Sequence, residues 1–327
     1  MILSTLGIDI AKLKFDVCLL NTEGKLKHRV FPNTAPGFAQ LGEWLTKHRV
    51  ECVHACMEAT GTYGEALALY LHSAEHKVSV INPAAVKAFA GSRLSRTKTD
   101  KVDAELIARF CQAQQPPAWT PPPAEVRDLQ ALVRRLEALV EMRGMEANRL
   151  EALISTPEVR RSVEEHVAYL AAEITRTEKL IREHIETHPD LKQRSELLDS
   201  IPGVGATTAA LLLAEIVDVT QYQSARQVAA YAGLVPRERR SGSSVRGRTR
   251  LSKIGNSRLR KALYFPAITA LRCSEFFKEW AAGLRERGKC KMSVIGAAMR
   301  KLIHLAYGVL KTGKPFDPEW AQSAKTA

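Results

Sequence analysis

A proline-rich stretch in the first half of the chain sets the strongest limit on the fold. It reads QQPPAWTPPP and covers residues 114–123 of the 327-residue sequence. Proline fixes φ and has no backbone N–H, so neither a helix interior nor a central strand can continue through this stretch. We therefore expect a domain boundary here, with a first domain at 1–123.

The segment before this boundary alternates between strand and helix signals. Strands are expected at 6–20, 25–31, 53–57 and 78–81, and helices at 35–47, 63–74, 83–89 and 100–114. Strands separated by helices predict an α/β layer built on a mixed sheet.

The segment 124–194 has the periodicity of long helices. Leucines recur there at steps of three and four residues: Leu129, Leu132, Leu136 and Leu139. A similar apolar repeat follows Pro157. Two helices that fold back on one another account for this pattern, either as a dimerising coiled coil or as a plain bundle pair.

The last segment, 195–327, is expected to be a mainly helical and strongly basic domain. Helices are expected at 224–232, 255–272 and 292–311. The segment 196–327 carries 22 basic and 10 acidic side chains, against 14 and 12 in 1–125, so it holds nearly all of the net charge of +13. A positive charge concentrated in one segment usually binds a polyanion, which indicates nucleic acid as the partner.

Nothing in the sequence indicates a membrane partner. No uninterrupted apolar run approaches the roughly 18 residues that a membrane span needs. The N-terminus, MILSTLGIDIAK, lacks the basic region that opens a signal peptide. We expect a cytoplasmic protein.

Four acidic residues of the first domain stand out by their positions. Asp9 interrupts an apolar strand, and Glu58 follows the apolar strand VHACM at the end where open α/β sheets place functional groups. Asp100 and Asp103 lie three residues apart at a helix start and share one face. Singly, each has a structural explanation, such as an N-cap or a capping-box acid. Together they are oxygen ligands that suit Mg²⁺ or Mn²⁺, which predicts metal-assisted phosphoryl transfer.

The stretch RRSGSSVRGRTR, residues 239–250, is expected to be a basic loop. Five of its twelve residues are arginine, and none of it can enter a hydrophobic core. Arg246, Arg248, Arg250 and the following Lys253 are candidate phosphate contacts. Solvated side chains without a ligand are the alternative for any one of them.

A second candidate for phosphate binding is the turn SIPGVG at 200–205. It lies between two helical segments, as in a helix-hairpin-helix motif, where backbone N–H groups of a glycine turn face a phosphate. Gly203 and Gly205 would be the residues involved. An ordinary tight turn between helices is the alternative.

Several short motifs are spread along nearly the whole chain. In the first half they are GIDIAK at 7–12, MEATGTY at 57–63, INPAAVKAFA at 81–90 and KTDKVDA at 98–104. In the second half they are SIPGVG at 200–205, AAYAGLVP at 229–236, SGSSVRG at 241–247 and LRKALY at 259–264. In kind and in order these motifs resemble the insertion-sequence one-ten family of transposases, above all its bridge-RNA-guided recombinases.

The resemblance implies more than the spacing does. It implies that 1–123 is a RuvC-like, RNase H-type domain whose four acids bind Mg²⁺. It implies a nucleophilic serine at Ser241, a 5′-phosphoserine intermediate, a bridge RNA that pairs with donor and target double-stranded DNA, and a dimer of dimers. From the residues alone, Ser243 and Ser244 are equal rivals of Ser241, because spacing does not choose among them.

Two further functions compete with an RNA-guided recombinase. The first is a metal-dependent endonuclease that resolves DNA junctions with water as the nucleophile. The second is a nucleic-acid scaffold without catalysis. A protein–DNA phosphodiester separates the recombinase from the endonuclease.

Overall fold

The computed structural model describes residues 3–59, 61–92, 100–152, 156–241 and 245–319, except for the side chains of 92, 238–241 and 245–248. The chain divides into two compact units: unit 1, Met1–Pro121, and unit 2, Pro122–Ala327. The division falls inside the proline-rich stretch. A further division of unit 2 at 194/195 stays a prediction.

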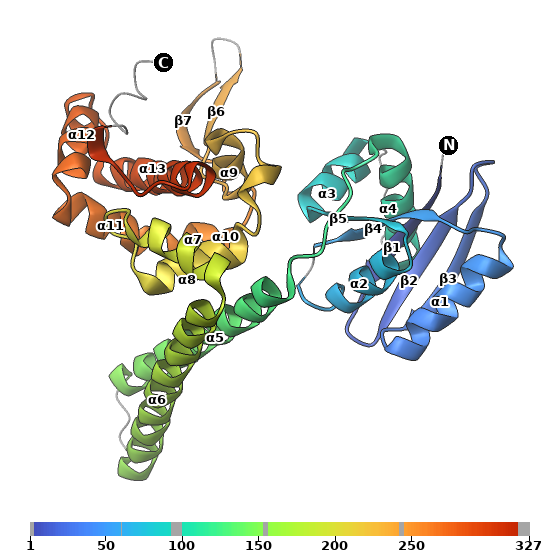
Figure 1. Ribbon diagram of the computed structural model, residues 1–327, viewed down its shortest axis with the longest axis horizontal. Coiled ribbons are helices and arrows are strands. Elements are labelled where there is room, and N and C mark those ends of the chain that lie inside the picture. The colour runs from blue at the N-terminus through green and yellow to red at the C-terminus, as the bar shows by residue number, and fades with distance from the viewer. Residues whose placement is uncertain (1–2, 60, 93–99, 153–155, 242–244, 320–327) are drawn as a thin grey trace. The chain divides into compact units, whose positions relative to one another are not determined.

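Unit 1 is built on one five-stranded mixed sheet (Figure 1). Its strands are β1 (Ser4–Ile10), β2 (Lys14–Leu20), β3 (Leu26–Pro32), β4 (Val53–Glu58) and β5 (Lys77–Ile81), in the order β3-β2-β1-β4-β5. β1 pairs antiparallel with β2 and parallel with β4. Its helices are α1 (Ala35–Lys47), α2 (Glu65–Ser73), α3 (Pro83–Ser92) and α4 (Asp100–Gln114). The α/β layer with a mixed sheet is confirmed.

The single strand expected at 6–20 is wrong, because the chain reverses direction after Ile10. The N–H of Ala11 donates to the Lys14 carbonyl at 2.9 Å and closes a turn. Leu13, which looked like part of the apolar strand, is 79% exposed in this turn. The reversal makes β2 a separate strand that pairs with β1 residue by residue.

Successive side chains along a strand point to opposite sides of the sheet, so the sheet has two different faces. One face carries Leu6 and Ile8 of β1 and packs on α1 and α2 through a large apolar core. The other face carries Thr5, Gly7 and Asp9 of β1 and is covered by α4 (Figure 1). The acids of interest therefore belong to the α4 side.

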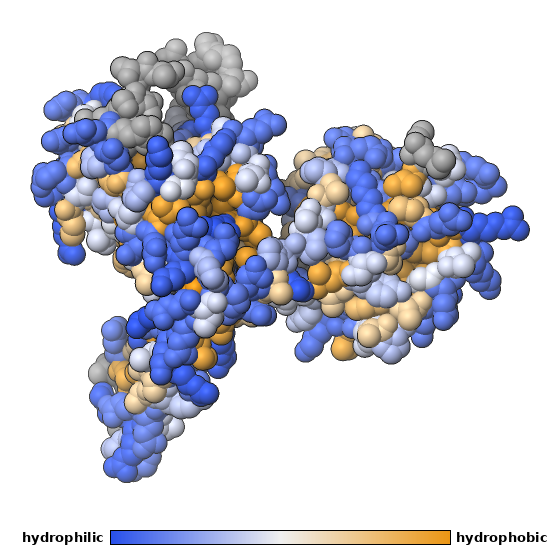
Figure 2. Space-filling model, in the orientation of Figure 1, coloured by the Kyte–Doolittle hydropathy of each residue, from blue (hydrophilic) through white to orange (hydrophobic). Residues whose placement is uncertain are grey.

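Unit 2 is mainly helical. Its long helices α5 (Ala124–Glu151) and α6 (Pro157–Thr187) lie side by side (Figure 1). Leu129, Leu136 and Leu139 are buried in the seam, and Leu132 packs against it. Figure 2 shows this pair covered mostly by hydrophilic residues, with apolar ones where it joins the rest of unit 2. The helical pair predicted over 124–194 is present.

The remaining elements of unit 2 form a compact helical body. They are α7 (Pro189–Asp199), α8 (Ala206–Glu215), the 3-10 turn Val219–Gln221, α9 (Ala225–Tyr231), β6 (Pro236–Ser241), β7 (Val245–Leu251), α10 (Ser257–Ala262), α11 (Tyr264–Cys273), α12 (Glu275–Glu286) and α13 (Lys291–Thr312). One apolar core runs from α5 to α13. By length and apolar composition alone, α13 is the one described helix that could cross a membrane. Its apolar residues are largely buried in the core of unit 2.

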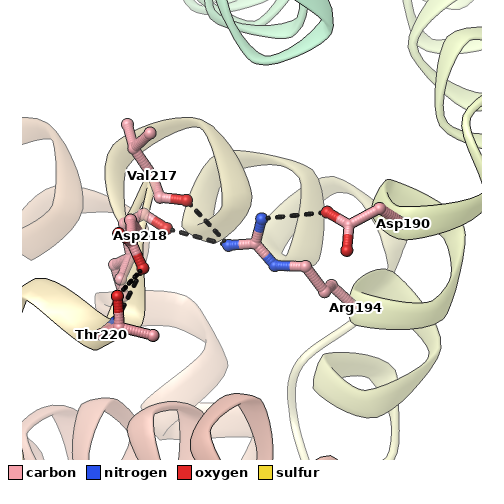
Figure 3. A network of polar contacts seen from close by, with 6 residues as sticks. Asp190, Arg194, Val217, Asp218 and Thr220 are labelled. Atoms are coloured by element: carbon pink, nitrogen blue, oxygen red, sulfur yellow. Dashed lines mark hydrogen bonds and ion pairs between the residues drawn. The ribbon is translucent and has the colours of Figure 1, made fainter. Parts of the chain in front are cut away.

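An arginine fastens α7 to the end of α8 (Figure 3). Arg194 donates to the carbonyls of Ile216 and Val217, at 3.3 and 3.0 Å, and pairs with Asp190 at 3.4 Å. A cation at the carboxyl end of a helix satisfies free carbonyls and complements the helix dipole. These contacts hold the two helices that flank the SIPGVG turn.

Two expectations for unit 2 need correction. The stretch 239–250, expected as a loop, is mostly an antiparallel pair of strands, β6 and β7. The helix expected at 255–272 is two helices, α10 and α11. Pro266 has no N–H to bond the Ala262 carbonyl, so it belongs in the first turn of a new helix.

Candidate active site

A close contact between β1 and α4 builds the site in unit 1. A Cβ placed on Gly7 would lie 2.1 Å from the Ala104 carbonyl oxygen and 2.3 Å from the Ala108 nitrogen. The Thr5 hydroxyl donates to the Ala108 carbonyl at 3.2 Å. Only glycine at position 7 lets the helix backbone come so close to the strand.

This contact brings the start of α4 to Asp9. Thr5 meets Ala108 and Gly7 meets Ala104, so α4 runs antiparallel to β1. Asp9 lies two residues beyond Gly7 on the strand. Asp103 directly precedes Ala104, and Asp100 lies one helical turn before it. Both of these acids are close enough for their charges to raise the pKa of Asp9.

Glu58 reaches the same face from the neighbouring strand. It is the last residue of β4, so it lies within the strand rather than after it as the sequence suggested. Asp9 and Glu58 each come one residue after the paired residues Ile8 and Met57 of the parallel ladder. Strand alternation places Glu58 on the face of Cys56, which packs in the cluster with α4. The structure thus gathers the four predicted acids at one end of the α4 side of the sheet.

A fifth acid, Asp16, belongs to this group and was missed from the sequence. Asp16 of β2 lies directly opposite Asp9 in the antiparallel ladder and is 9% exposed. A hairpin turn at residues 11–13 would have predicted it, because such a turn places Asp16 of the second strand beside Asp9 of the first. We call Asp9, Asp16, Glu58, Asp100 and Asp103 the acid face.

The charges of the acid face are only partly compensated. Burial raises the pKa of Asp9, and the charges of Asp103, Asp100 and Asp16 raise it further. Lys14 opposes them: its Nζ lies 2.8 Å from Asp100 Oδ2 and 3.2 Å from Asp16 Oδ2. The hydrogen bond from Lys14 holds the pKa of Asp100 below its ordinary value, and that of Lys14 is raised in return.

The acid face suits a divalent metal by its chemistry. Its ligands would all be carboxylate oxygens, which hard cations such as Mg²⁺ prefer. The raised pKa of Asp9 marks negative charge that a bound cation would relieve. In the part of the chain that the structure describes, no three acid, histidine or cysteine side chains already converge as a metal site. Two of the acids instead point to Lys14.

Unit 2 places Ser241 on a β-hairpin. Ser241 is the last residue of β6 and pairs with Val245 of β7. Arg246 and Arg248 belong to β7, where Arg246 pairs with Arg240, and Arg250 is exposed near the end of that strand. Ser243 and Ser244, the rival nucleophiles, lie outside the described residues.

The two legs of this hairpin are joined to each other at its base. The N–H of Ser252 donates to the Val235 carbonyl at 2.8 Å, and that of Lys253 to the Gly233 carbonyl at 3.1 Å. Lys253 itself is exposed and has φ of 58°, a conformation that few residues other than glycine adopt. The arginine-rich strands thus start from a fixed base.

The two glycines of SIPGVG differ in their surroundings. A Cβ on Gly203, whose φ is 87°, would lie 2.4 Å from the Pro266 carbonyl oxygen of α11. Packing and backbone conformation therefore require glycine there, whether or not a phosphate binds. Gly205 is exposed before α8, and a Cβ there would meet no atom within 4 Å. Phosphate binding by this turn stays a prediction.

Comparison with known proteins assigns the whole chain to one family. Residues 6–156 match a family model described as a transposase, of the DEDD type of IS110 elements, and residues 195–282 match the model of the transposase IS116/IS110/IS902 family. The pilin gene-inverting protein of Moraxella bovis is 36% identical over 95% of this chain and 97% of its own length. The transposase of insertion sequence element IS1328 from Yersinia enterocolitica is 27% identical over 95% and 98%. The chain therefore belongs to the IS116/IS110/IS902 family of transposases and is an enzyme of DNA transposition or recombination.

Proposed function

We propose that this enzyme is an RNA-guided, site-specific DNA recombinase that exchanges strands between donor and target DNA through a serine. The observation that carries the metal chemistry is the gathering of Asp9, Glu58, Asp100 and Asp103 on one face, with the helix and the sheet in backbone contact. The order of these acids along the chain is also the order in the name of the matched DEDD model. Two relatives named for gene inversion support recombination.

In the proposed reaction Asp9, Glu58, Asp100 and Asp103 of the acid face would hold Mg²⁺. The metal would polarise the scissile phosphate and offset the charge that develops on it. The hydroxyl oxygen of Ser241 would form a bond to phosphorus, and the bond to the 3′ oxygen would break. The products are a 5′-phosphoserine and a free 3′-hydroxyl, to which the serine proton passes. A 3′-hydroxyl of the other DNA then attacks the phosphoserine and restores the serine.

The basic side chains of unit 2 would hold the nucleic acids. Ser241 is followed in the sequence by four basic residues: Arg246, Arg248, Arg250 and Lys253. Arginine pairs with phosphate in a bidentate manner. The basic excess of 196–327 and the motif resemblance support a guide RNA and double-stranded DNA as partners. Assembly as a dimer of dimers, in the bacterial cytoplasm, completes the proposal.

Trapping the covalent intermediate tests this mechanism. Purified protein is incubated with Mg²⁺, RNA transcribed from the non-coding flank of the element, and DNA labelled on the 3′ side of the expected break, the side whose 5′-phosphate would be joined to the serine. Wild type should give a labelled protein band on a denaturing gel, and Ser241→Ala should give none. Ser243→Ala and Ser244→Ala, which remove neighbouring hydroxyls, should keep the band.

Each failure has its own meaning. Cleavage without any covalent band would reject the serine and favour a junction-resolving endonuclease with water as nucleophile. A band that Ser243→Ala or Ser244→Ala abolishes would move the nucleophile. Full activity without the RNA would reject RNA guidance. Asp103→Asn should reduce strand exchange about 1000-fold, as loss of a ligand of the reacting centre typically does; unchanged activity would reject the metal site.

A further inference from the structure

Lys14 is placed as a cation inside the acid face. Its ammonium bridges Asp100 of α4 and Asp16 of β2, at 2.8 and 3.2 Å. It is also close enough to Asp9 for its charge to lower the pKa of that carboxyl. The ammonium thus lies where the helix and the sheet bring the acids together.

The backbone holds Lys14 in this position. Its carbonyl accepts the N–H of Ala11 in the turn between β1 and β2, and it pairs with Pro32 of β3. Lys14 and Asp16 are two residues apart on one strand, so both lie on the α4 side. The hairpin thus fixes which side of the sheet Lys14 occupies, and the two ion pairs place its half-exposed side chain.

Among the described residues no three acid, histidine or cysteine side chains converge as a metal site, and two of the acids contact the Lys14 ammonium. A Mg²⁺ site needs oxygens about 2.1 Å from one point, whereas Asp100 and Asp16 here point to a shared ammonium. An ammonium and a divalent cation repel each other strongly at such range. The two cations would therefore compete for Asp100, whose Oδ2 already accepts the ammonium.

We propose that Lys14 is a resident counter-cation of the acid face, which a divalent metal must displace from Asp100 before it binds. Asp16 is the positioning residue of this exchange: it keeps the ammonium when Asp100 is released to the metal. This inference rests on the proposed metal site and adds a competition that the four-acid description lacks.

Removal of the Lys14 charge should therefore tighten metal binding. Binding of Mn²⁺ alone to the full-length chain, without nucleic acid, is measured by electron paramagnetic resonance of the free ion at constant ionic strength. Lys14→Gln should bind about tenfold more tightly than wild type, because a nearby like charge is gone. Lys14→Arg, which keeps the charge, should bind no more tightly than wild type.

Lys12→Gln is the matched control. It removes the same charge two residues away, from an exposed side chain. Its affinity for Mn²⁺ should change little. Equal effects of Lys12→Gln and Lys14→Gln would overturn the inference, since a general field would then explain both. Weaker binding in Lys14→Gln would also overturn it, since Lys14 would then be preparing the acids for the metal.

A double-mutant cycle tests the part assigned to Asp16. Asp16→Asn should weaken Mn²⁺ binding in the wild type, because Lys14 is left on Asp100, and should have little effect in Lys14→Gln. An equal loss in both backgrounds would make Asp16 a metal ligand and contradict its positioning role.

The proposed function can fail separately. If wild type, Lys14→Gln and Asp103→Asn bind Mn²⁺ alike, or none of them binds it, the acid face is not a metal site. If Asp103→Asn abolishes binding but Lys14→Gln leaves it unchanged, the metal site stands and the competition is wrong. Circular dichroism of each variant confirms that it is folded.

Discussion

The acid face and the serine hairpin are held by different means. The acids lie on strands of a five-stranded sheet and on a helix whose backbone touches that sheet through Gly7. Ser241 lies at the far end of a strand whose hairpin is a separate two-stranded sheet. The hairpin is tied at its base, through Ser252 and Lys253.

This difference suits the two roles that we propose for these residues. Metal ligands must be fixed to fractions of an ångström, which packed helices and sheets achieve. A nucleophile that forms a bond to DNA and then releases it has to approach a large, variable partner. A hairpin anchored at one end carries it without disturbing the fold below. Substitutions that act on one region and spare the other test this contrast.

Gly7→Ala should have the largest effect, and only on unit 1. The new Cβ would meet two backbone atoms of α4, at 2.1 and 2.3 Å, so the helix must move away from the sheet. We expect a loss of about 3 kcal/mol in the free energy of unfolding of unit 1. Urea unfolding followed by circular dichroism measures it. Mn²⁺ binding should weaken as well, because α4 carries Asp100 and Asp103.

Gly91→Ala is the control for this change. Gly91 lies in α3 of the same unit, and a Cβ there would meet no atom within 4 Å. Alanine is the better helix former, so stability should stay equal or rise slightly. A similar loss in both variants would show that backbone contact with α4 is not what holds the acid face.

Gly255→Ala should act on the hairpin base with a smaller effect. Gly255 has φ of 134°, and its Cβ would lie 2.2 Å from the Tyr231 carbonyl oxygen. We expect a loss of about 2 kcal/mol, because the residue is only half-buried and the loop can adjust. The formation of covalent protein–DNA complex should fall while Mn²⁺ affinity stays unchanged.

The control in unit 2 is Gly283→Ala, on α12 with no atom near its Cβ. It should be neutral for stability and for covalent complex formation. A drop in Mn²⁺ affinity in Gly255→Ala, with none in Gly283→Ala, would contradict the independence of the two regions.

The sequence predicted the elements of unit 1 well, because its periodicities are clean and its turns are marked. The helix at 35–47 and the one at 100–114 match α1 and α4 in full. All four acids could be named in advance: Asp9 and Glu58 interrupt or follow an apolar strand, and Asp100 and Asp103 share one face at a helix start. The motif resemblance adds the prediction that they share a metal and that Ser241 is the nucleophile, and both stay predictions.

What the sequence did not predict depends on pairing between strands. Asp16 looked like an ordinary charge inside one long strand, and only the reversal after Ile10 makes it the partner of Asp9. Lys14 was missed for the same reason. The hairpin at 236–251 was missed because arginine and serine give no apolar alternation, so the ladder between β6 and β7 leaves no mark in hydropathy.

Asp9→Asn should have the smallest effect on stability, and it should stabilise the chain where the two glycine substitutions destabilise it. Folding raises the pKa of Asp9 above its ordinary value of 3.8, so above that pH the folded chain binds more protons than the unfolded chain. Stability contributed by this group is therefore lost as the pH rises through the raised pKa. At pH 7, without metal, Asp9→Asn should melt a few degrees higher than wild type in a thermal scan. The gap should close as the pH falls through the raised pKa of Asp9, where the wild-type side chain gains its proton. Glu43→Gln, an exposed neutralisation on α1, should show no such pH-dependent gain.

With Mg²⁺ the order of the melting temperatures should reverse, because the metal stabilises only the chain that keeps its charged Asp9. A variant that melts below wild type at pH 7 without metal would mean that Asp9 is a structural residue whose charge the acid face already accommodates.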